Sequence, residues 1–487
     1  MLPPNSAEPS QLLPVSPPPP FARYPLTVFD NSFQRSAFVT GWLVQGEIDT
    51  NALGNALRRM TEKWRVLAGR LEAIPDTKNW QICVPLGPLP EDYPTFLLTA
   101  SISDVPLSTY ITIPLETSSE SLPLTLFFHP ASPRQNSDWV VKNLPITCWH
   151  VTHFPSRVAG EPSYSCIGFG RSHGIFDGIG AASVIRALVA EMQGKEWDVP
   201  PPPPEGYHPN PIDQLLLHKV GKGPAKYPQP GYSALGVKGT LWLVGWHLRE
   251  RYWRGSIHRI FSIPQECISL LVEGVKSDVQ RNVLHSVGEN ILTTGDVLVA
   301  WLVKVIYAQG SPPQTVMHCS NFASFRDLIA KAGGESLAHY PHNAFLPLPY
   351  PTLTVKEVNS LTLPQLTWKL CQARHELNLD HVISAHQFMT SNTITMPVHP
   401  SADETLVISN VSASRILEAD WSAVGSQGTI CGYRFSATPT SLIIGNAAYI
   451  SGRVGSSTIL DVNLNKARTY NLTRAIEELK IRVLNAT

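Results

Sequence analysis

The chain has 487 residues, of which 43% are hydrophobic and 16% are charged. Its 38 Lys and Arg residues equal its 38 Asp and Glu residues, so no overall field would attract nucleic acid or an anionic membrane. This composition is typical of a soluble globular protein, long enough for two domains or one large one.

Seven cysteines are scattered along the chain, and none forms a C-x-x-C pair. Neither a zinc cage nor a disulfide framework is therefore predicted, and the expected compartment is reducing and cytoplasmic. Near Met1 no basic segment leads into an apolar one, so we expect neither a signal peptide nor a membrane anchor.

The first half of the chain mixes strand and helix patterns. Residues 1–23 are rich in Pro and Ser and predict a flexible tail. Short β-type runs follow within 24–46, and residues 85–145 show no clear period. Apolar periodicity predicts a helix over 51–63, strands over 80–84, 148–154 and 164–170, and a helix over 179–192.

Five consecutive prolines, 200–204, mark the clearest boundary. Such a run continues neither a helix nor a central strand, so residues 199–230 predict a semi-rigid connector. It separates an N-terminal lobe, 24–198, from a C-terminal lobe, 231–487. The apolar stretch Leu241–Trp246 is too short to span a bilayer. We expect it to pack in the core or line an apolar entrance, with an interfacial helix as the alternative.

The second half again alternates the two kinds of element, and no repeat of 20–50 residues is visible. The whole chain therefore predicts a mixed α/β fold in two lobes. The patterns predict strands over 258–263, 317–325, 405–411, 433–436 and 441–444, with helices over 264–276, from Thr293 or Thr294 through Val305, and over 472–484.

The stretch Arg171–Gly178, which reads R-S-H-G-I-F-D-G, lies between the strand over 164–170 and the helix over 179–192. His173 is therefore predicted to stand in a tight loop, where a general base is usually presented. A second H-x-x-x-D, starting at His399, lies among prolines and opens no helix, as a chance match would. A loop histidine with only a local hydrogen bond remains the alternative.

Several segments, in this order, resemble the BAHD-type acyltransferases, a group related to chloramphenicol acetyltransferase and to condensation domains. The resemblance covers the chain after residue 24 and is nearest to fungal secondary-metabolite O-acetyltransferases. The second family signature, D-F-G-W-G, keeps only an acid and an aromatic, at Asp420 and Trp421. The matching segments are Leu67–Leu71, His173–Gly178, Thr294–Trp301, His342–Ala344 and Ser409–Asp420.

This resemblance implies two chloramphenicol-acetyltransferase-like lobes, each a mixed sheet flanked by helices, with a channel between them. It implies transfer of an acyl group, acetyl by default, from acetyl-CoA or another acyl-CoA. The acceptor would be a hydroxyl of a hydrophobic secondary metabolite such as a terpenoid or polyketide. We expect no permanently bound cofactor, no metal, no nucleic-acid partner, no membrane span and a monomer.

The chemistry of acyl transfer assigns roles to particular residues. An imidazole near its reference pKa of about 6.5 can take the alcohol proton and return it to the leaving thiolate. We therefore expect His173 to be the general base of a direct transfer without an acyl-enzyme. Ser409 or Asn410 would donate to the tetrahedral oxyanion.

The resemblance also suggests supporting residues. It favours a structural Asp177 that pairs with Arg326 and holds the loop together with Gly178; the alternative is that Asp177 orients the His173 ring. Asp420 remains from the second signature. Three basic residues could meet the phosphates of coenzyme A, with solvated surface charge as the alternative: Arg453, Lys466 and Arg468.

Three other functions stay open. Residues 170–174 match the serine-hydrolase elbow G-x-S-x-G with Ser172 as nucleophile, although no later acid and histidine are marked out. A condensation-type enzyme would take its acyl group from a carrier protein; such enzymes usually carry a second His where Ser172 stands. A non-catalytic descendant of the fold is the third. The pairs His150/His153 and His339/His342 lack the partners of a metal site.

Overall fold

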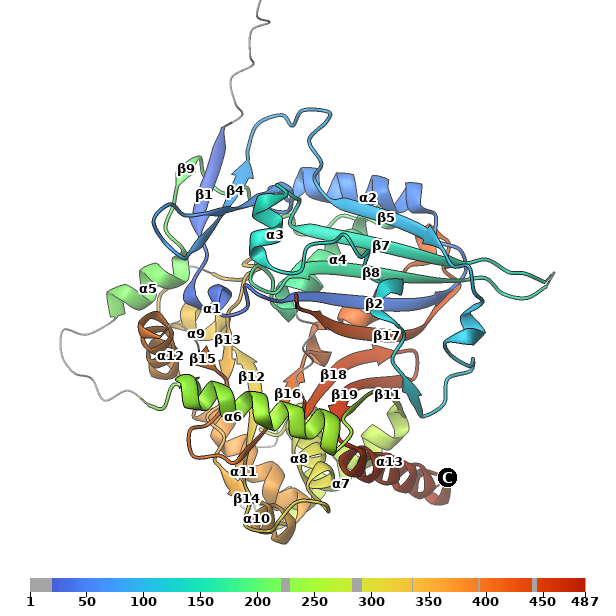
Figure 1. Ribbon diagram of the computed structural model, residues 1–487, viewed down its shortest axis with the longest axis vertical. Helices are drawn as coiled ribbons and strands as arrows, with labels where there is room; N and C mark the ends of the chain where they lie inside the picture. Colours follow the sequence, from blue (N-terminus) through green and yellow to red (C-terminus); the bar gives the residue numbers. More distant parts are fainter. Residues whose placement is uncertain are drawn as a thin grey trace, which may run out of the picture.

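The alternating apolar runs of both halves form two large sheets, one in each lobe, as Figure 1 shows. The structure is a computed structural model that describes residues 20–158, 160–219, 228–282, 291–334, 336–392, 395–439 and 445–486. The predicted mixed α/β class is confirmed. The strand expected over 441–444 lies outside the described residues.

The N-terminal lobe is built on a five-stranded sheet in the order β17-β2-β8-β7-β5. Its apolar side chains and those of helices α2 (Thr50–Lys63) and α4 (Gly178–Met192) form one core, and α2 packs on α4. The strands are β2 (Ala37–Gln45), β5 (Leu97–Ile102), β7 (Thr147–Phe154), β8 (Tyr164–Ser172) and β17 (Gly428–Ala437).

The C-terminal lobe is built on an eight-stranded sheet in the order β13-β12-β16-β18-β19-β11-β6, with β14 beside β12. Apolar residues of α7, α8, α11 and α13 share its core. The strands are β6 (Ser118–Glu120), β11 (Ile257–Pro264), β12 (Val316–Ser324), β13 (Phe345–Pro347), β14 (Leu353–Thr354), β16 (Glu404–Asn410), β18 (Ala447–Val454) and β19 (Ser457–Leu464). The helices are α7 (Gln265–Asn282), α8 (Thr294–Ile306), α10 (Val355–Ser360), α11 (Leu363–His375) and α13 (Lys466–Ala486).

Each lobe receives one strand from the other half of the chain. Strand β17, from the second half, pairs antiparallel with β2, so that Arg434 lies opposite Thr40. Strand β6, from the first half, pairs antiparallel with β11, so that Ile260 lies opposite Ser119. Backbone hydrogen bonds within each sheet therefore join the two halves of the chain across the boundary expected at the prolines.

Elements outside the two large sheets correct two expectations. Strand β1 begins at Phe21, inside the expected tail, and the expected connector contains a short strand and a nine-residue helix that starts at Pro211. Prolines 200–204 themselves form neither helix nor strand. The remaining elements are β1 (Phe21–Pro25), α1 (Val28–Asn31), β3 (Arg70–Ala73), β4 (Trp80–Pro85), α3 (Asn136–Val141), β9 (Gly206–Tyr207), α5 (Pro211–Lys219), β10 (Ser233–Ala234), α9 (Arg326–Lys331), α12 (Leu379–Ser391) and β15 (Thr395–Met396).

The apolar stretch Leu241–Trp246 belongs to helix α6 (Val237–Leu248), and most of it is exposed. Only Trp246 of this helix is buried. The expectation that the stretch packs in the core is therefore wrong. Among the described residues, no helix is long and apolar enough to cross a membrane.

Candidate active site

The loop that carries His173 is held at both ends by regular structure. Strand β8 ends at Ser172, where it pairs with Ala37 of β2. Helix α4 begins at Gly178, and the side chain of Asp177 caps it by accepting a hydrogen bond from the amide of Gly180 at 2.8 Å. An aspartate at this position satisfies an amide that the helix itself leaves free. The strand and the cap leave His173 little freedom of position.

The imidazole of His173 lies in an aromatic cage. Phe33 stacks on the ring at 4.2 Å between centroids, and Phe38 meets it edge-on at 4.4 Å. Nδ1 of His173 donates to the carbonyl oxygen of Phe176 at 3.2 Å. Because Nδ1 is the donor, Nε2 carries the lone pair, which is the form that a general base requires.

The surroundings of His173 keep it uncharged. Burial, with a smaller effect from the nearby guanidinium of Arg171, lowers the pKa of His173 from 6.5 to about 4. The Phe176 carbonyl and the Asp177 carboxylate raise it, but by less. At neutral pH the ring is therefore in its basic form.

Asp177 faces away from the His173 ring and toward the second half of the chain. Its Oδ2 accepts a hydrogen bond from Nη1 of Arg326 at 2.8 Å and another from the amide of Ala344 at 3.3 Å. Arg326 also donates through Nη2 to the carbonyl oxygens of Tyr340 and His342. Among the described residues no hydrogen bond joins Asp177 to His173. The arrangement fits a loop support rather than a catalytic dyad.

A second clamp holds the same loop through His342 and Asn343. Nδ1 of His342 donates to the carbonyl oxygen of Ile175 at 2.8 Å, and Nδ2 of Asn343 donates to that of His173 at 2.8 Å. Asn343 is fixed in turn by the buried carboxyl of Asp30, which accepts from its amide and its side chain. Desolvation raises the pKa of Asp30 to about 7 against these hydrogen bonds.

The end of strand β16 brings Ser409 and Asn410 toward the helix that follows His173. A Cβ on Gly178 would lie 2.9 Å from Val411, so the two segments are in close contact. Oδ1 of Asn410 is engaged by the amide and hydroxyl of Ser412, at 3.1 and 2.7 Å. Ser409 lies opposite Tyr449 of β18.

A cleft of about 330 Å³ lies next to this site, between β17 and strands β11, β18 and β19. Phe38 lines it on one side and contacts His173 on the other. The Arg434 side chain lies over Phe38 and Tyr449, and its Nη1 is buried without a hydrogen-bond partner. The cleft therefore offers a hydrogen-bond donor near the base.

The same cleft holds a second histidine. Nε2 of His258 lies 2.5 Å from Oδ1 of Asp461. Burial disfavours the charged ring, but the Asp461 carboxylate outweighs this and raises the pKa of His258 above its usual value. His258 and Asp461 therefore form an ion pair in the wall of the cleft whenever the ring is protonated.

Asp420 lies away from His173, whereas Arg453 and Lys466 lie near the two ends of β19. Asp420 is exposed and accepts from Gln193, just past the far end of α4, which is about 22 Å from its first turn at 1.5 Å per residue. Arg453 lies by the β18–β19 hairpin, opposite Thr458. Lys466 is the first residue of α13, beyond the other end of β19. The rise of the strand puts that end about 20 Å from the hairpin.

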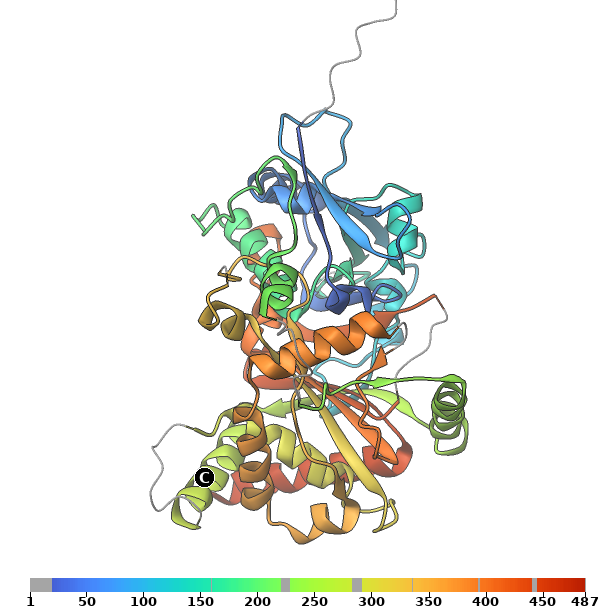
Figure 2. The same ribbon diagram turned by 90° about the vertical axis from the view of Figure 1, so that its left-hand side faces the viewer.

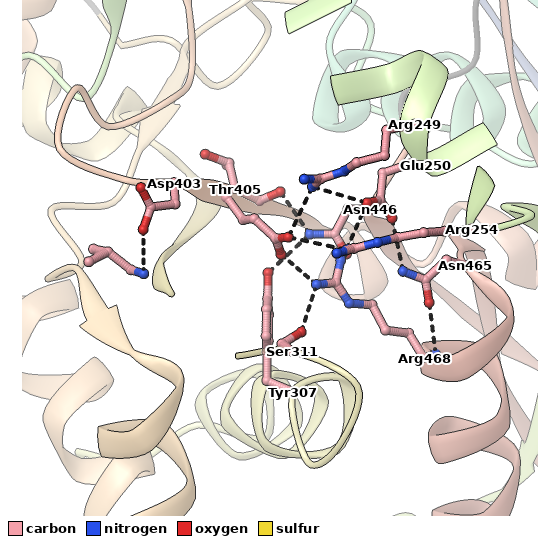
Figure 3. Close-up of polar contacts among 12 residues, drawn as sticks. Arg249, Glu250, Arg254, Tyr307, Ser311, Asp403, Thr405, Asn446, Asn465 and Arg468 are labelled. Carbon is pink, nitrogen blue, oxygen red and sulfur yellow. Dashed lines mark hydrogen bonds and ion pairs between the residues drawn. The ribbon is translucent and has the colours of Figure 1, made fainter. Parts of the chain in front are cut away.

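Arg468 is buried, which corrects the expectation that it could meet coenzyme A at the surface. Figure 3 shows its guanidinium among Arg249, Arg254 and two carboxylates. It pairs with Glu404 and donates to Asn446 at 2.8 Å. Its donors are already engaged inside the C-terminal lobe.

Ser172 is placed for structure. Its hydroxyl is buried, donates to Oδ1 of Asn136 and accepts from the amide of Gly174 at 3.0 Å. No histidine is hydrogen-bonded to it in the described part of the chain, so the hydrolase arrangement is missing there. The described residues also contain no group of three or more possible metal ligands.

Several residues at the site were not predicted, chiefly the Phe33, Phe38 and Phe345 rings around His173 and the Arg434 donor. Phe33 and Phe38 precede the motif by more than 130 residues, and Arg434 follows it by more than 250. Scattered aromatics carry no periodic signal. The clamp residues His342 and Asn343 could be found from the sequence, because they lie in one of the segments that resemble the BAHD-type acyltransferases.

The chain was compared with known proteins. No model of a known protein family matches it. O-acyltransferase pboC of Aspergillus ustus is 24% identical over 312 residues, which are 62% of this chain and 61% of that protein. The match thus covers less than two thirds of its length.

Solved structures match almost the whole chain. TRI101 of F. graminearum, complexed with coenzyme A and deoxynivalenol, is 12% identical, with 93% of this chain and 97% of that chain covered and a TM-score of 0.60. TRI101 of F. sporotrichioides, complexed with coenzyme A and T-2, is 15% identical, with 94% and 98% covered and a TM-score of 0.56. The chain has the TRI101 fold.

A condensation domain of the calcium-dependent antibiotic synthetase shares this TRI101 fold, at 12% identity, 95% and 96% coverage and a TM-score of 0.54. The resemblance noted from sequence segments is therefore confirmed, as is the two-lobed fold that it implied. The TRI101 fold is common to proteins of different substrates, so residues of this chain must support any function.

Proposed function

We propose that the protein is an acyl-CoA-dependent O-acyltransferase. It would move an acyl group, acetyl by default, to a hydroxyl of a hydrophobic small molecule such as a terpenoid or polyketide. The observation that carries the proposal is the neutral His173 imidazole, whose Nδ1 is engaged by Phe176 and whose Nε2 is left basic. The A. ustus relative is an O-acyltransferase by name, which supports the proposal, and so do the coenzyme A complexes of TRI101.

The reaction follows from this geometry. Nε2 of His173 takes the proton of the acceptor hydroxyl while its oxygen attacks the thioester carbonyl. A tetrahedral oxyanion forms, and a hydroxyl or amide donor from Ser409 or Asn410 stabilises it. The intermediate then expels the thiolate of coenzyme A, which receives the proton back from the imidazolium. Asp177 and Arg326 keep the loop in place and touch neither reactant.

We assign the acceptor to the cleft bordered by Phe38. Its wall includes the apolar side chains of Leu122, Leu124 and Phe435, which would contact a hydrophobic alcohol. Arg434 would donate to an oxygen of the acceptor, because its buried Nη1 otherwise lacks a partner. The acyl-CoA would approach His173 from the opposite side.

The test is thiol release from acetyl-CoA with a panel of hydrophobic alcohols. Wild type should release thiol only when an acceptor is present. The rate of this release should be at least about a hundredfold lower in His173→Gln, since general bases contribute about 10² to 10⁴ to the rate. His150→Gln is the matched control, because His150 is also buried with its pKa lowered to about 4 but lies in β7.

Equal rates for His173→Gln and wild type would overturn the mechanism. Transfer only from a carrier-protein thioester would favour the condensation-type enzyme instead. Failure to bind coenzyme A in calorimetry, together with no thiol release, would favour a non-catalytic descendant of the fold.

A further inference from the structure

Helix α6 and the π-helical turn that continues it, Arg249–Trp253, carry an apolar face open to solvent. Successive members of the face are three or four residues apart, so they form one stripe along the helix. Tyr252 and Trp253 extend it into the turn and are 72% and 89% exposed. The stripe consists of Val237, Leu241, Val244 and Leu248, whose exposed fractions are 79%, 67%, 49% and 51%.

The opposite face of the same helix is anchored to the C-terminal lobe. Trp246 is buried, and Glu250, one turn later, is only 1% exposed. Glu250 accepts from Arg254 and Asn465, both at 2.9 Å, and Figure 3 shows this network continuing to Arg468. The anchoring fixes which face points outward. Figure 2 shows the helix nearly end-on at the side of the molecule.

The exposed charges along α6 and the turn have one sign. Lys238 and Arg251 are exposed, and so is Arg249, although it pairs with Glu250 and Glu404. The single carboxylate of the segment, Glu250, is buried in the network. An apolar stripe with tryptophan and tyrosine at its edges and cations beside it matches a helix that lies in the lipid–water interface. Anionic lipids attract such cations by about 1 kcal/mol each.

We propose that this face docks the protein onto an anionic lipid surface, with α6 parallel to the membrane plane. A second copy of the chain fits less well. In a two-fold contact α6 would meet α6 and bring like charges together. One helical stripe is also small beside the roughly 800 Å² per partner of a stable dimer. The proposal does not depend on the acyl-transfer chemistry.

Docking can be measured by sedimenting the full chain with vesicles of phosphatidylcholine alone or mixed with phosphatidylserine. We expect co-sedimentation with the mixed vesicles and its weakening as salt is raised. Leu241→Glu with Leu248→Glu should abolish binding. Lys238→Gln with Arg251→Gln should weaken it by about fivefold for each charge removed.

Val141→Glu with Ile481→Glu is the matched control, because both residues are exposed apolar side chains on other helices, α3 and α13. Its binding should equal that of wild type. Urea unfolding of every variant separates loss of docking from loss of fold. The salt dependence of vesicle binding by wild type tests the proposal even if a variant fails to fold.

Three results would overturn the proposal. The first is no sedimentation of wild type with mixed vesicles. The second is equal binding by the Leu241/Leu248 variant and wild type. The third is a wild-type dimer in sedimentation velocity that this variant dissociates while vesicles bind neither protein, which would assign the face to a second copy.

Discussion

Asp177 and Arg326 are 149 residues apart in sequence, yet their side chains meet at 2.8 Å in the interior. One comes from the loop after β8 and the other from the first residue of α9, so their contact fastens the His173 loop of the first half to the second half of the chain. The carboxylate that the H-x-x-x-D pattern places four residues after the base is thus committed to holding the loop.

We expect Asp177→Asn to destabilise the protein by about 3–5 kcal/mol, because it leaves the buried Arg326 without its counterion. Chemical unfolding in urea measures this. A double-mutant cycle with Arg326→Gln should return a large coupling energy. The fall of kcat at low pH should move slightly further toward acid, because the Asp177 carboxylate raises the pKa of His173 through its charge without a hydrogen bond to the ring. A large loss of kcat in a variant that stays fully folded would instead support the orienting role.

The value of kcat/KM should change little as the pH falls below 7. A general base acts in its neutral form, and the pKa of His173 is lowered to about 4, so kcat/KM should stay level from pH 7 down to about pH 5. It should fall only as the pH drops through about 4. Phe33→Ala should move the fall toward the reference value of about 6.5, because burial is the largest cause of the shift. A wild-type profile that falls near pH 6.5 would contradict this.

Helix α4 sits against backbone at its third residue. A Cβ on Gly180 would lie 1.9 Å from the carbonyl oxygen of Pro341, which cannot rotate away. Gly180→Ala should therefore cost about 1–3 kcal/mol or more and lower activity, because α4 carries the His173 loop. Gly274→Ala in α7 is the control: no atom lies within 4 Å of its added Cβ. It should stabilise by about 0.5–1 kcal/mol.

Arg434 should act on the acceptor rather than on coenzyme A. Its replacement by Gln removes a donor to a bound oxygen, and a charge-assisted hydrogen bond contributes about 1.5–3 kcal/mol. We expect kcat/KM for the acceptor to fall by about ten- to a hundredfold while the affinity for coenzyme A, measured by calorimetry, is retained. Arg474→Gln, an exposed residue of α13, serves as the control. Weaker coenzyme A binding by Arg434→Gln would contradict this and would assign the acyl donor, rather than the acceptor, to the cleft.

Arg468 and Lys466 are two residues apart but should behave differently. Arg468→Gln leaves Glu404 buried without this partner, so stability should drop by about 3–5 kcal/mol while KM for acyl-CoA is kept. Lys466→Gln, at an exposed position, should leave stability unchanged. A raised KM for acyl-CoA in a fully stable Arg468→Gln protein would show that the arginine meets the cofactor after all.

Features with a local signal could be predicted from the sequence. The strand over 164–170, the helix over 179–192 and the loop with His173 between them were predicted because apolar periods of two and 3.6 residues are read directly from neighbouring positions. For the same reason the expected bounds of α2 and α8 agree with the structure within about two residues.

Tertiary structure alone decided the features that depend on residues far apart in the chain. The exchange of β17 and β6 between the sheets, the aromatic cage of Phe33 and Phe38, and the cleft beside Arg434 bring together residues more than a hundred positions apart. No local period exists for such contacts. Leu241–Trp246 shows the limit most clearly. Its composition indicates only that it is apolar, and the buried Glu250 network decides that one face of α6 turns outward to solvent.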